Sequence, residues 1–227
     1  MSKIKVSRKE LLKKPDEFIT KTARAIIFAR KYSRQFQLIG IIIVALALIY
    51  VGATTYKSYI NKKGQEAFNT AYYSIIKKAA VGNDQGNPTE SENLFRKVTD
   101  DYGLSKASSL ALPELAYIKF MRKEYDAAID LYRQFQDKIS ENDPYQSLTN
   151  LALAVCFEEM GELDNAIKTL ELITSSQDDF FKEQAMLNLA RTYSAAGQES
   201  KSQEILNDFV RKYQTSPFLA LAKARIK

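Results

Sequence analysis

The chain has 227 residues, of which 45% are apolar and 26% are charged, the composition of a folded protein with one or two domains. It contains no histidine and a single cysteine, which excludes histidine-based catalytic and metal sites, intramolecular disulfides and cysteine zinc clusters. A glycine-rich phosphate loop, a nucleophile elbow and a metal-ligand cluster are also missing from the sequence. We therefore expect no enzyme, no cofactor, no metal and no small-molecule substrate.

Residues 1–34 form a strongly basic arm. Its net charge is +8, whereas the rest of the chain carries −2 of the total +6. The charge therefore does not mark a folded nucleic-acid-binding face, and we expect no nucleic-acid partner. Ser7 and Glu10 have capping-box spacing for a short helix, which Pro15 interrupts. From Asp16 we expect an amphipathic helix that lies on anionic membrane lipid, or alternatively a solvated tail without a lipid role.

An uncharged, apolar run of 22 residues extends from Gln35 to Tyr56. A helix of this length spans about 33 Å, which matches a hydrocarbon core of about 30 Å. A buried core helix would be expected to keep a polar side. A cleaved secretory signal usually has a shorter apolar region, with its small-residue cleavage site after that region. The sequence therefore predicts an uncleaved signal-anchor helix over residues 35–59.

The distribution of lysine and arginine predicts the orientation of this helix. Basic residues near a membrane span are retained on the cytoplasmic side. The arm holds 11 of them, whereas only three stand close behind the span. We expect a single-pass protein of a bacterial inner membrane, with its N-terminus in the cytoplasm and residues 60–227 in the periplasm. The expected topology determinants are Lys21, Arg24, Arg30, Lys31 and Arg34.

Residues 60–227 have helical periodicity throughout, and three segments of this part repeat. Each segment has a first helix with a leucine–alanine pair, a turn, and a second helix with a small residue before a large apolar one. The turns lie at Lys123, Gly161 and Gly197, which are 38 and 36 residues apart. The small residues of the first helices are Ala116, Ala154 and Ala190, and those of the second helices are Ala128, Ala166 and Ser202.

This pattern resembles the tetratricopeptide repeat, a helix–turn–helix unit of about 34 residues. The first copy departs from it at Lys119, where an aromatic residue is expected. The resemblance implies an all-α solenoid, with small residues where helices cross and a concave surface that binds partners. The expected parts are a degenerate helix pair at 66–102, repeats at about 109–142, 147–180 and 183–216, and a capping helix at 217–226.

The basic arm, the single span and the repeats together resemble a narrower group of bacterial membrane proteins. Its best-known member is the ancillary subunit of the Sec translocon, which belongs to the periplasmic chaperone network. This resemblance implies that the partners are proteins: the translocon, periplasmic folding factors or client polypeptides.

The first helices of the repeats are expected to line a binding groove with the side chains that face away from the second helices. These side chains are mostly apolar and aromatic, with one arginine, so the groove would suit an amphipathic helix or an unfolded apolar segment. Alternatively, the chain's own residues 66–80 fill it. The expected groove residues are Leu110, Pro113, Tyr117, Phe120, Leu148, Leu151, Val155, Glu158, Gln184, Leu187, Arg191 and Ser194.

Other reactive side chains have plainer interpretations. Cys156 lies between Ala154 and Phe157 on a first helix, where a small buried hydrophobic residue is expected. The acidic pairs at 100–101, 158–159 and 178–179 consist of adjacent residues, which point to different sides of a helix and form no catalytic pair.

Two functions remain open from the sequence. The first is a membrane-anchored, chaperone-like helper or adaptor at the protein-translocation machinery. The second is a structural scaffold subunit of another envelope complex, such as one for secretion, division or outer-membrane assembly.

Overall fold

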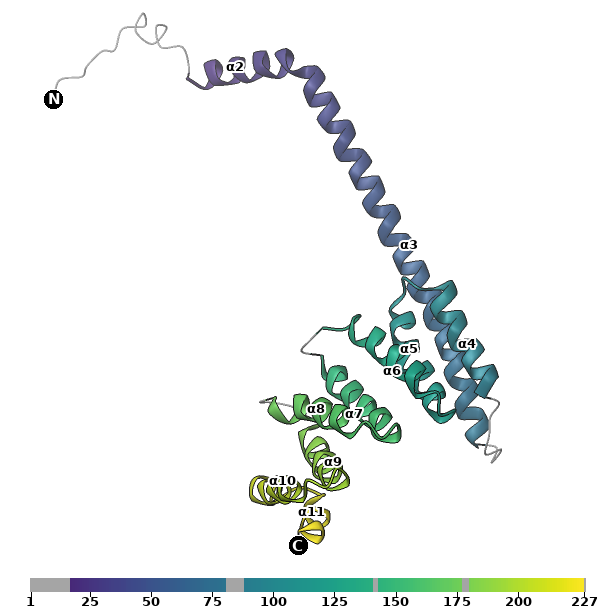
Figure 1. Ribbon diagram of the computed structural model, residues 1–227. Coiled ribbons are helices and arrows are strands. Elements are labelled where there is room, and N and C mark those ends of the chain that lie inside the picture. The colour runs from purple at the N-terminus through teal and green to yellow at the C-terminus, as the bar shows by residue number, and fades with distance from the viewer. Residues whose placement is uncertain (1–16, 81–87, 141–142, 177–179, 227) are drawn as a thin grey trace, which may run out of the picture. The chain divides into compact units, whose positions relative to one another are not determined.

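The computed structural model describes the backbone of residues 17–80, 88–140, 143–176 and 180–226 (Figure 1). Contacts divide the chain into two compact units, Met1–Tyr56 and Lys57–Lys227. Every regular element among the described residues is an α-helix, which confirms the all-α fold class. The helices are α2 (Glu17–Lys31), α3 (Ser33–Ala80), α4 (Pro88–Asp101), α5 (Lys106–Met121), α6 (Tyr125–Gln136), α7 (Pro144–Glu159), α8 (Leu163–Ser175), α9 (Lys182–Ala195), α10 (Glu199–Lys212) and α11 (Leu219–Arg225).

The first unit contains α2 and the apolar part of α3. The helix expected from Asp16 corresponds to α2, whereas the capping box at Ser7 and Glu10 lies outside the described residues. Basic side chains of this unit that the structure describes are exposed; they are Arg24, Arg30, Lys31 and Arg34, and the side chain of Lys21 lies outside the described residues.

The apolar run of α3 is exposed along its whole length. From Phe36 to Val51 its large hydrophobic side chains are between 49% and 70% exposed, unlike those of a core helix. The Thr54 hydroxyl donates to a backbone carbonyl of its own helix, that of Tyr50 or of Val51, each at 3.0 Å. Such internal pairing is what a polar group needs in lipid. By length and composition α3 can cross a membrane once, which is consistent with a single-pass anchor.

The second unit begins where the later part of α3 packs against α4 and the start of α5. Phe68 and the fully buried Phe95 place their rings 5.6 Å apart, edge to face. A Cβ atom on Gly64 would lie 2.4 Å from Oγ of Ser105, so only glycine permits this approach. Asn61 accepts a hydrogen bond from the Lys106 amide at 2.9 Å. These contacts hold α3 against the start of α5.

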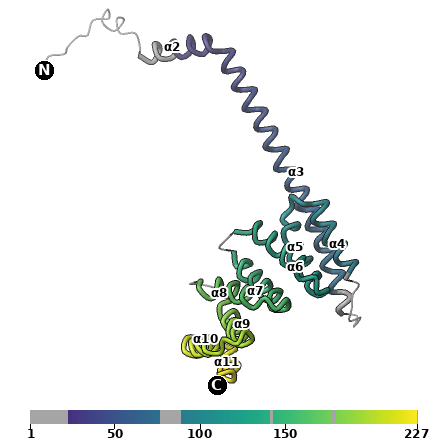
Figure 2. Tube along the Cα trace, viewed as in Figure 1, coloured from purple at the N-terminus to yellow at the C-terminus, as the bar shows by residue number. Residues whose placement is uncertain are grey.

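Three helix pairs follow in chain order, α5 with α6, α7 with α8 and α9 with α10, and α11 packs on the last pair (Figure 2). The small residues that the sequence places at helix crossings are buried, all at 3% exposure or less; they are Ala116, Ala128, Ala154, Ala166, Ala190 and Ser202. The Ser202 hydroxyl donates to the Ala190 carbonyl at 2.7 Å, so its polar group is satisfied inside the crossing.

The turn within each pair has one residue in the left-handed backbone region. These residues are Lys123 (φ 63°), Gly161 (φ 76°) and Gly197 (φ 72°). Glycine adopts this conformation at little cost, whereas the Cβ atom of lysine crowds the backbone there. The first turn therefore carries a strain that the other two do not.

Candidate functional site

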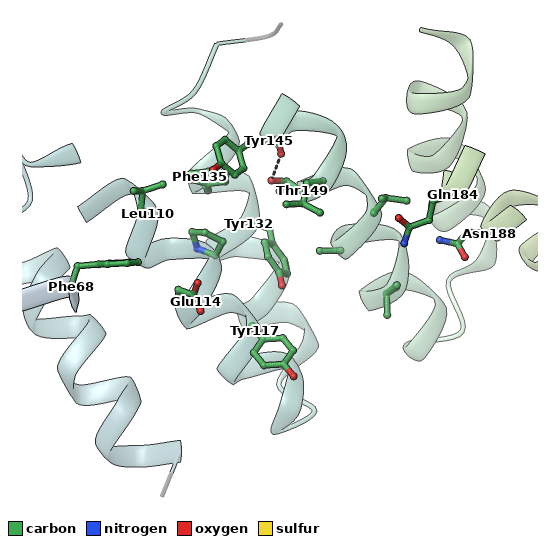
Figure 3. A pocket seen from close by; sticks show the side chains of 15 residues that line it. Phe68, Leu110, Glu114, Tyr117, Tyr132, Phe135, Tyr145, Thr149, Gln184 and Asn188 are labelled. Atoms are coloured by element: carbon green, nitrogen blue, oxygen red, sulfur yellow. Dashed lines mark hydrogen bonds between the residues drawn. The ribbon is translucent and has the colours of Figure 1, made fainter. Parts of the chain in front are cut away.

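An apolar groove of about 590 Å³ lies across the first helices of the three pairs (Figure 3). Helices α5 and α7 form most of its lining, and α6 and α9 supply further residues. Phe68 of α3 also lines it. The lining residues are Phe68, Leu110, Pro113, Glu114, Tyr117, Tyr132, Phe135, Tyr145, Leu148, Thr149, Leu151, Ala152, Val155, Gln184 and Asn188.

Helical periodicity explains why these side chains meet. On α5 the lining residues recur at intervals of three and four, as do those on α7, so each helix presents one stripe to the groove. The same spacing places Gln184 and Asn188 on one face of α9. Figure 3 shows that Tyr132 and Phe135, which belong to the second helix α6, also reach this lining.

Seven of the twelve side chains expected from the sequence line the groove, namely Leu110, Pro113, Tyr117, Leu148, Leu151, Val155 and Gln184. The other five lie elsewhere. Phe120 packs on Tyr125, with ring centroids 5.6 Å apart. Leu187 is buried, with 5% exposure, in a cluster with Phe209 and Ala222. Arg191 and Ser194 line a separate hollow, and Glu158 forms an ion pair with Arg191.

The groove has a buried floor and an exposed rim. Phe135 and Leu151 are 1% and 6% exposed, so they belong to the core of the domain as well as to the lining. Tyr117 and Leu148 are 53% and 45% exposed. Large apolar side chains with this exposure around a hollow are typical of a surface that contacts a partner.

The helix over residues 66–80 was one candidate to fill the groove. Among its described side chains, Ala71 is fully buried in a cluster with Phe95 and Val98, and Phe68 contributes to the lining. Tyr72 stacks on Phe68, with ring centroids 6.1 Å apart. Among the described residues, this helix thus supplies a side chain to the lining.

Glu114 is the charged residue among the described residues of the lining, and it is not one of the groove residues expected from the sequence. Burial raises the pKa of its carboxyl above the ordinary value of 4.5. The pKa of Tyr132 is also raised, chiefly by burial and further by the nearby groups of Cys156, Glu114 and Tyr117. Glu114 lies four residues after Leu110 and three before Tyr117, so the spacing that identified those two residues could have identified it.

The arginine expected in the groove belongs to a different hollow. Arg191 Nη2 lies 2.6 Å from Oε2 of Glu158, and the buried Thr192 hydroxyl donates to the same carboxylate. A hollow of about 370 Å³ adjoins Arg191, with Ser194 and Arg225 also in its lining. The charge of Arg191 is thus paired within the chain and lies outside the apolar groove.

Cys156 is fully buried and carries a free thiol. Burial raises its pKa to about 11, so the thiol is neutral near pH 7. A reactive cysteine needs the opposite environment, exposed and electropositive. Among the described residues, no group of three or more Cys, Asp or Glu could hold a metal ion.

Comparison with known proteins identifies the repeats. Residues 31–185 match the family described as "Tetratricopeptide repeat-like domain", and residues 184–216 match "Tetratricopeptide repeat". A search of curated proteins found no significant match.

Solved structures share the fold. The putative kinesin light chain TPR-like repeats of Podosopora anserina superpose with a TM-score of 0.55 at 17% identity, over 72% of this chain and 82% of that one. A tetratricopeptide repeat protein from Parabacteroides merdae gives a TM-score of 0.53 at 14% identity, over 68% of this chain and 58% of that one. Because the first family match covers more than half of the sequence, the chain belongs to the tetratricopeptide repeat-like domain family.

Proposed function

We propose that this protein is a membrane-anchored, periplasmic interaction module that acts as a chaperone-like helper or adaptor at the protein-translocation machinery. Its tetratricopeptide repeats indicate a protein–protein interaction module. The observation that carries the finer proposal is the apolar groove with its exposed rim, in the same chain as a helix long and apolar enough to cross a membrane. Such a groove suits amphipathic or unfolded apolar segments, which are abundant where polypeptides emerge from a translocation channel.

The charge distribution supports the proposed orientation. Basic residues concentrated on the N-terminal side of the span favour a cytoplasmic N-terminus, which would place the repeats in the periplasm. A reporter that is active only in the periplasm, fused after Lys227, should then be active. Neutralising the five topology determinants should give a mixed orientation. An inactive periplasmic reporter on the unaltered chain would contradict the proposed location.

Photocrosslinking from the groove tests the helper role. A photoreactive residue at Tyr117 or Leu148 should capture a range of nascent or misfolded polypeptides, because both side chains are exposed on the rim. The matched control position is Leu172 on α8, which is 63% exposed but does not line the groove. Capture of one stoichiometric partner from the rim would favour a structural scaffold in an envelope complex instead.

A further inference from the structure

Glu114 differs from the other partly buried carboxylates that the structure describes. Glu92, whose side chain is 8% exposed, contacts Arg96, Lys119 and Arg122, and Glu158, at 11%, contacts Arg191. Glu114 has neither a hydrogen bond nor an ion pair with any residue that the structure describes. A carboxylate withdrawn from water is costly unless it is paired, so this position is destabilising for the isolated domain.

The surroundings of Glu114 are suited to a long cationic side chain. Figure 3 shows Tyr117 and Tyr132 on the same lining as Glu114. Tyrosine rings attract ammonium and guanidinium groups, and the apolar stem of lysine or arginine packs on aromatic surfaces. The other lining residues are uncharged, so a cation would find no competing positive charge there.

We propose that Glu114 pairs with a lysine or arginine carried on the apolar face of an amphipathic helical segment bound in the groove. The proposal rests on the proposed function of the groove and specifies its ligand. The segment's apolar side chains occupy the space between α5 and α7, and its basic side chain meets the Glu114 carboxylate. Charge complementarity thus selects apolar segments that carry a basic residue.

The same carboxylate disfavours other ligands. A segment with an uninterrupted apolar face would cover Glu114 without giving it a partner, and a segment with an acidic residue there would add repulsion. Both effects lower the affinity for the unsuitable ligand. Unpaired or repelling charges of this kind are a common source of binding specificity. The groove therefore discriminates against uniformly apolar helices, such as membrane spans.

Designed peptides test this specificity on the full chain in detergent micelles. Three fluorescent 16-residue amphipathic helices carry leucine and phenylalanine on one face, with lysine, norleucine or glutamate at the centre of that face. The norleucine peptide carries its lysine on the polar face instead, so that its net charge equals that of the lysine peptide. Fluorescence anisotropy should show that the lysine peptide binds roughly tenfold more tightly than the norleucine peptide.

Substitutions at Glu114 should change which peptide binds most tightly, and not only the overall affinity. Glu114→Gln should bind the lysine and norleucine peptides equally, and Glu114→Lys should favour the glutamate peptide. Glu204→Gln, which removes an exposed carboxylate on α10, is the matched control and should keep the original preference. Equal binding of the first two peptides by the unaltered chain would overturn the proposal, as would an unchanged preference in Glu114→Gln.

Failure of this inference can be separated from failure of the proposed function. If all three peptides bind with equal affinity and the double variant Tyr117→Gln, Leu148→Gln loses binding, the groove binds apolar segments without a preference for a basic residue. The proposed function then holds and the Glu114 proposal is wrong. If no peptide binds, the groove is not a client site, and both proposals are wrong.

Discussion

The Nζ atom of Lys119 lies 3.2 Å from Oε1 of Glu92, so an ion pair joins α4 to the end of α5. Lys119 stands at the position of Phe157 and Tyr193 in the following repeats, whose side chains are buried. Its own side chain is only 13% exposed, and its ammonium group also lies 2.6 Å from Oε2 of Glu124. In the first repeat an ionic network thus replaces the aromatic packing of the other two.

Replacing Glu92 with glutamine should destabilise the domain, because Lys119 and Arg122 would lose their shared carboxylate. Removing one partner from a largely buried pair costs about 2 kcal/mol or more, which corresponds to a melting temperature lower by about 4–8 °C. Thermal unfolding of the full chain in detergent measures this. Glu66→Gln is the control, because Glu66 pairs with Lys63 at an exposed site, and it should not change the melting temperature measurably.

The effect of Glu92→Gln should depend on pH. Burial acts to raise the pKa of Glu92, but the hydrogen bonds from Arg96 and Lys119 and the positive charges of Lys119 and Arg122 together outweigh it, and the pKa is lowered below 4.5. A lowered folded-state pKa stabilises the fold above the unfolded-state pKa, and this contribution disappears as the pH falls through the folded value. The melting temperatures of the variant and of the original chain should therefore converge in strong acid. A constant difference would contradict the ionic origin of the effect.

The three turn residues predict opposite responses to substitution. Lys123→Gly should raise the melting temperature by about 2–4 °C, because glycine relieves a left-handed conformation that costs other residues about 1 kcal/mol. Gly161→Ala should lower it by a similar amount. A Cβ atom at Gly161 meets no atom within 4 Å, so backbone conformation alone is tested. A loss of stability in Lys123→Gly would contradict this account.

Glu114→Gln should stabilise the domain near neutral pH, in contrast to Glu92→Gln. Because the folded-state pKa of Glu114 is raised, folding favours its protonated form, and the stability of the original chain falls as the pH rises through and above 4.5. The amide removes this penalty, so the melting temperature should rise by about 2–4 °C at pH 7.

The melting temperatures of Glu114→Gln and of the original chain should converge below pH 4.5, where Glu114 is protonated in both the folded and the unfolded state. The neighbouring Tyr132 and Cys156 have raised pKa values and do not titrate in this range. Glu204→Gln, at an exposed position, is the control and should leave the dependence of the melting temperature on pH unchanged. A lower melting temperature for Glu114→Gln at pH 7 would show that the carboxylate has a stabilising partner.

The fold follows from local sequence signals, whereas the groove depends on contacts between repeats. The repeat register predicts turns at Lys123, Gly161 and Gly197, and each of these residues has a positive φ. The burial of Leu187 was not predictable in this way, because it depends on packing with Phe209 of α10 and Ala222 of α11.

Two further features needed the structure for the same reason. Tyr132 belongs to a second helix, and its place in the lining depends on the spacing between neighbouring first helices. In the sequence, Gly64 is one glycine within a helical segment. Its close contact with Ser105 depends on how α3 packs against the residue that precedes α5. Glu114 differs from both: it lies on a predicted stripe, but a single acidic residue on a helix is usually solvated, so the sequence alone did not distinguish it.

Aspartate substitutions on the rim and on the floor of the groove should have different effects on peptide binding and on the melting temperature. Tyr117→Asp should weaken binding of the norleucine peptide at least tenfold, because the new charge would be desolvated against an apolar ligand. It should leave the melting temperature within about 2 °C, since an exposed side chain adds little to the core. Leu172→Asp, at an exposed position outside the groove, is the control for both measurements and should change neither.

Leu151→Asp should behave differently, because Leu151 is 6% exposed and packs in a core cluster together with Phe157 and Leu189. Its carboxylate would be buried in the domain itself, which costs several kcal/mol and should lower the melting temperature by roughly 10 °C or more. Leu187→Asp should be equally destabilising, although Leu187 does not line the groove. If Tyr117→Asp lowered the melting temperature as much as Leu151→Asp, the rim would be part of the core and not a surface open to a partner. If Tyr117→Asp left both stability and peptide binding unchanged, the ligand would bind elsewhere on the domain.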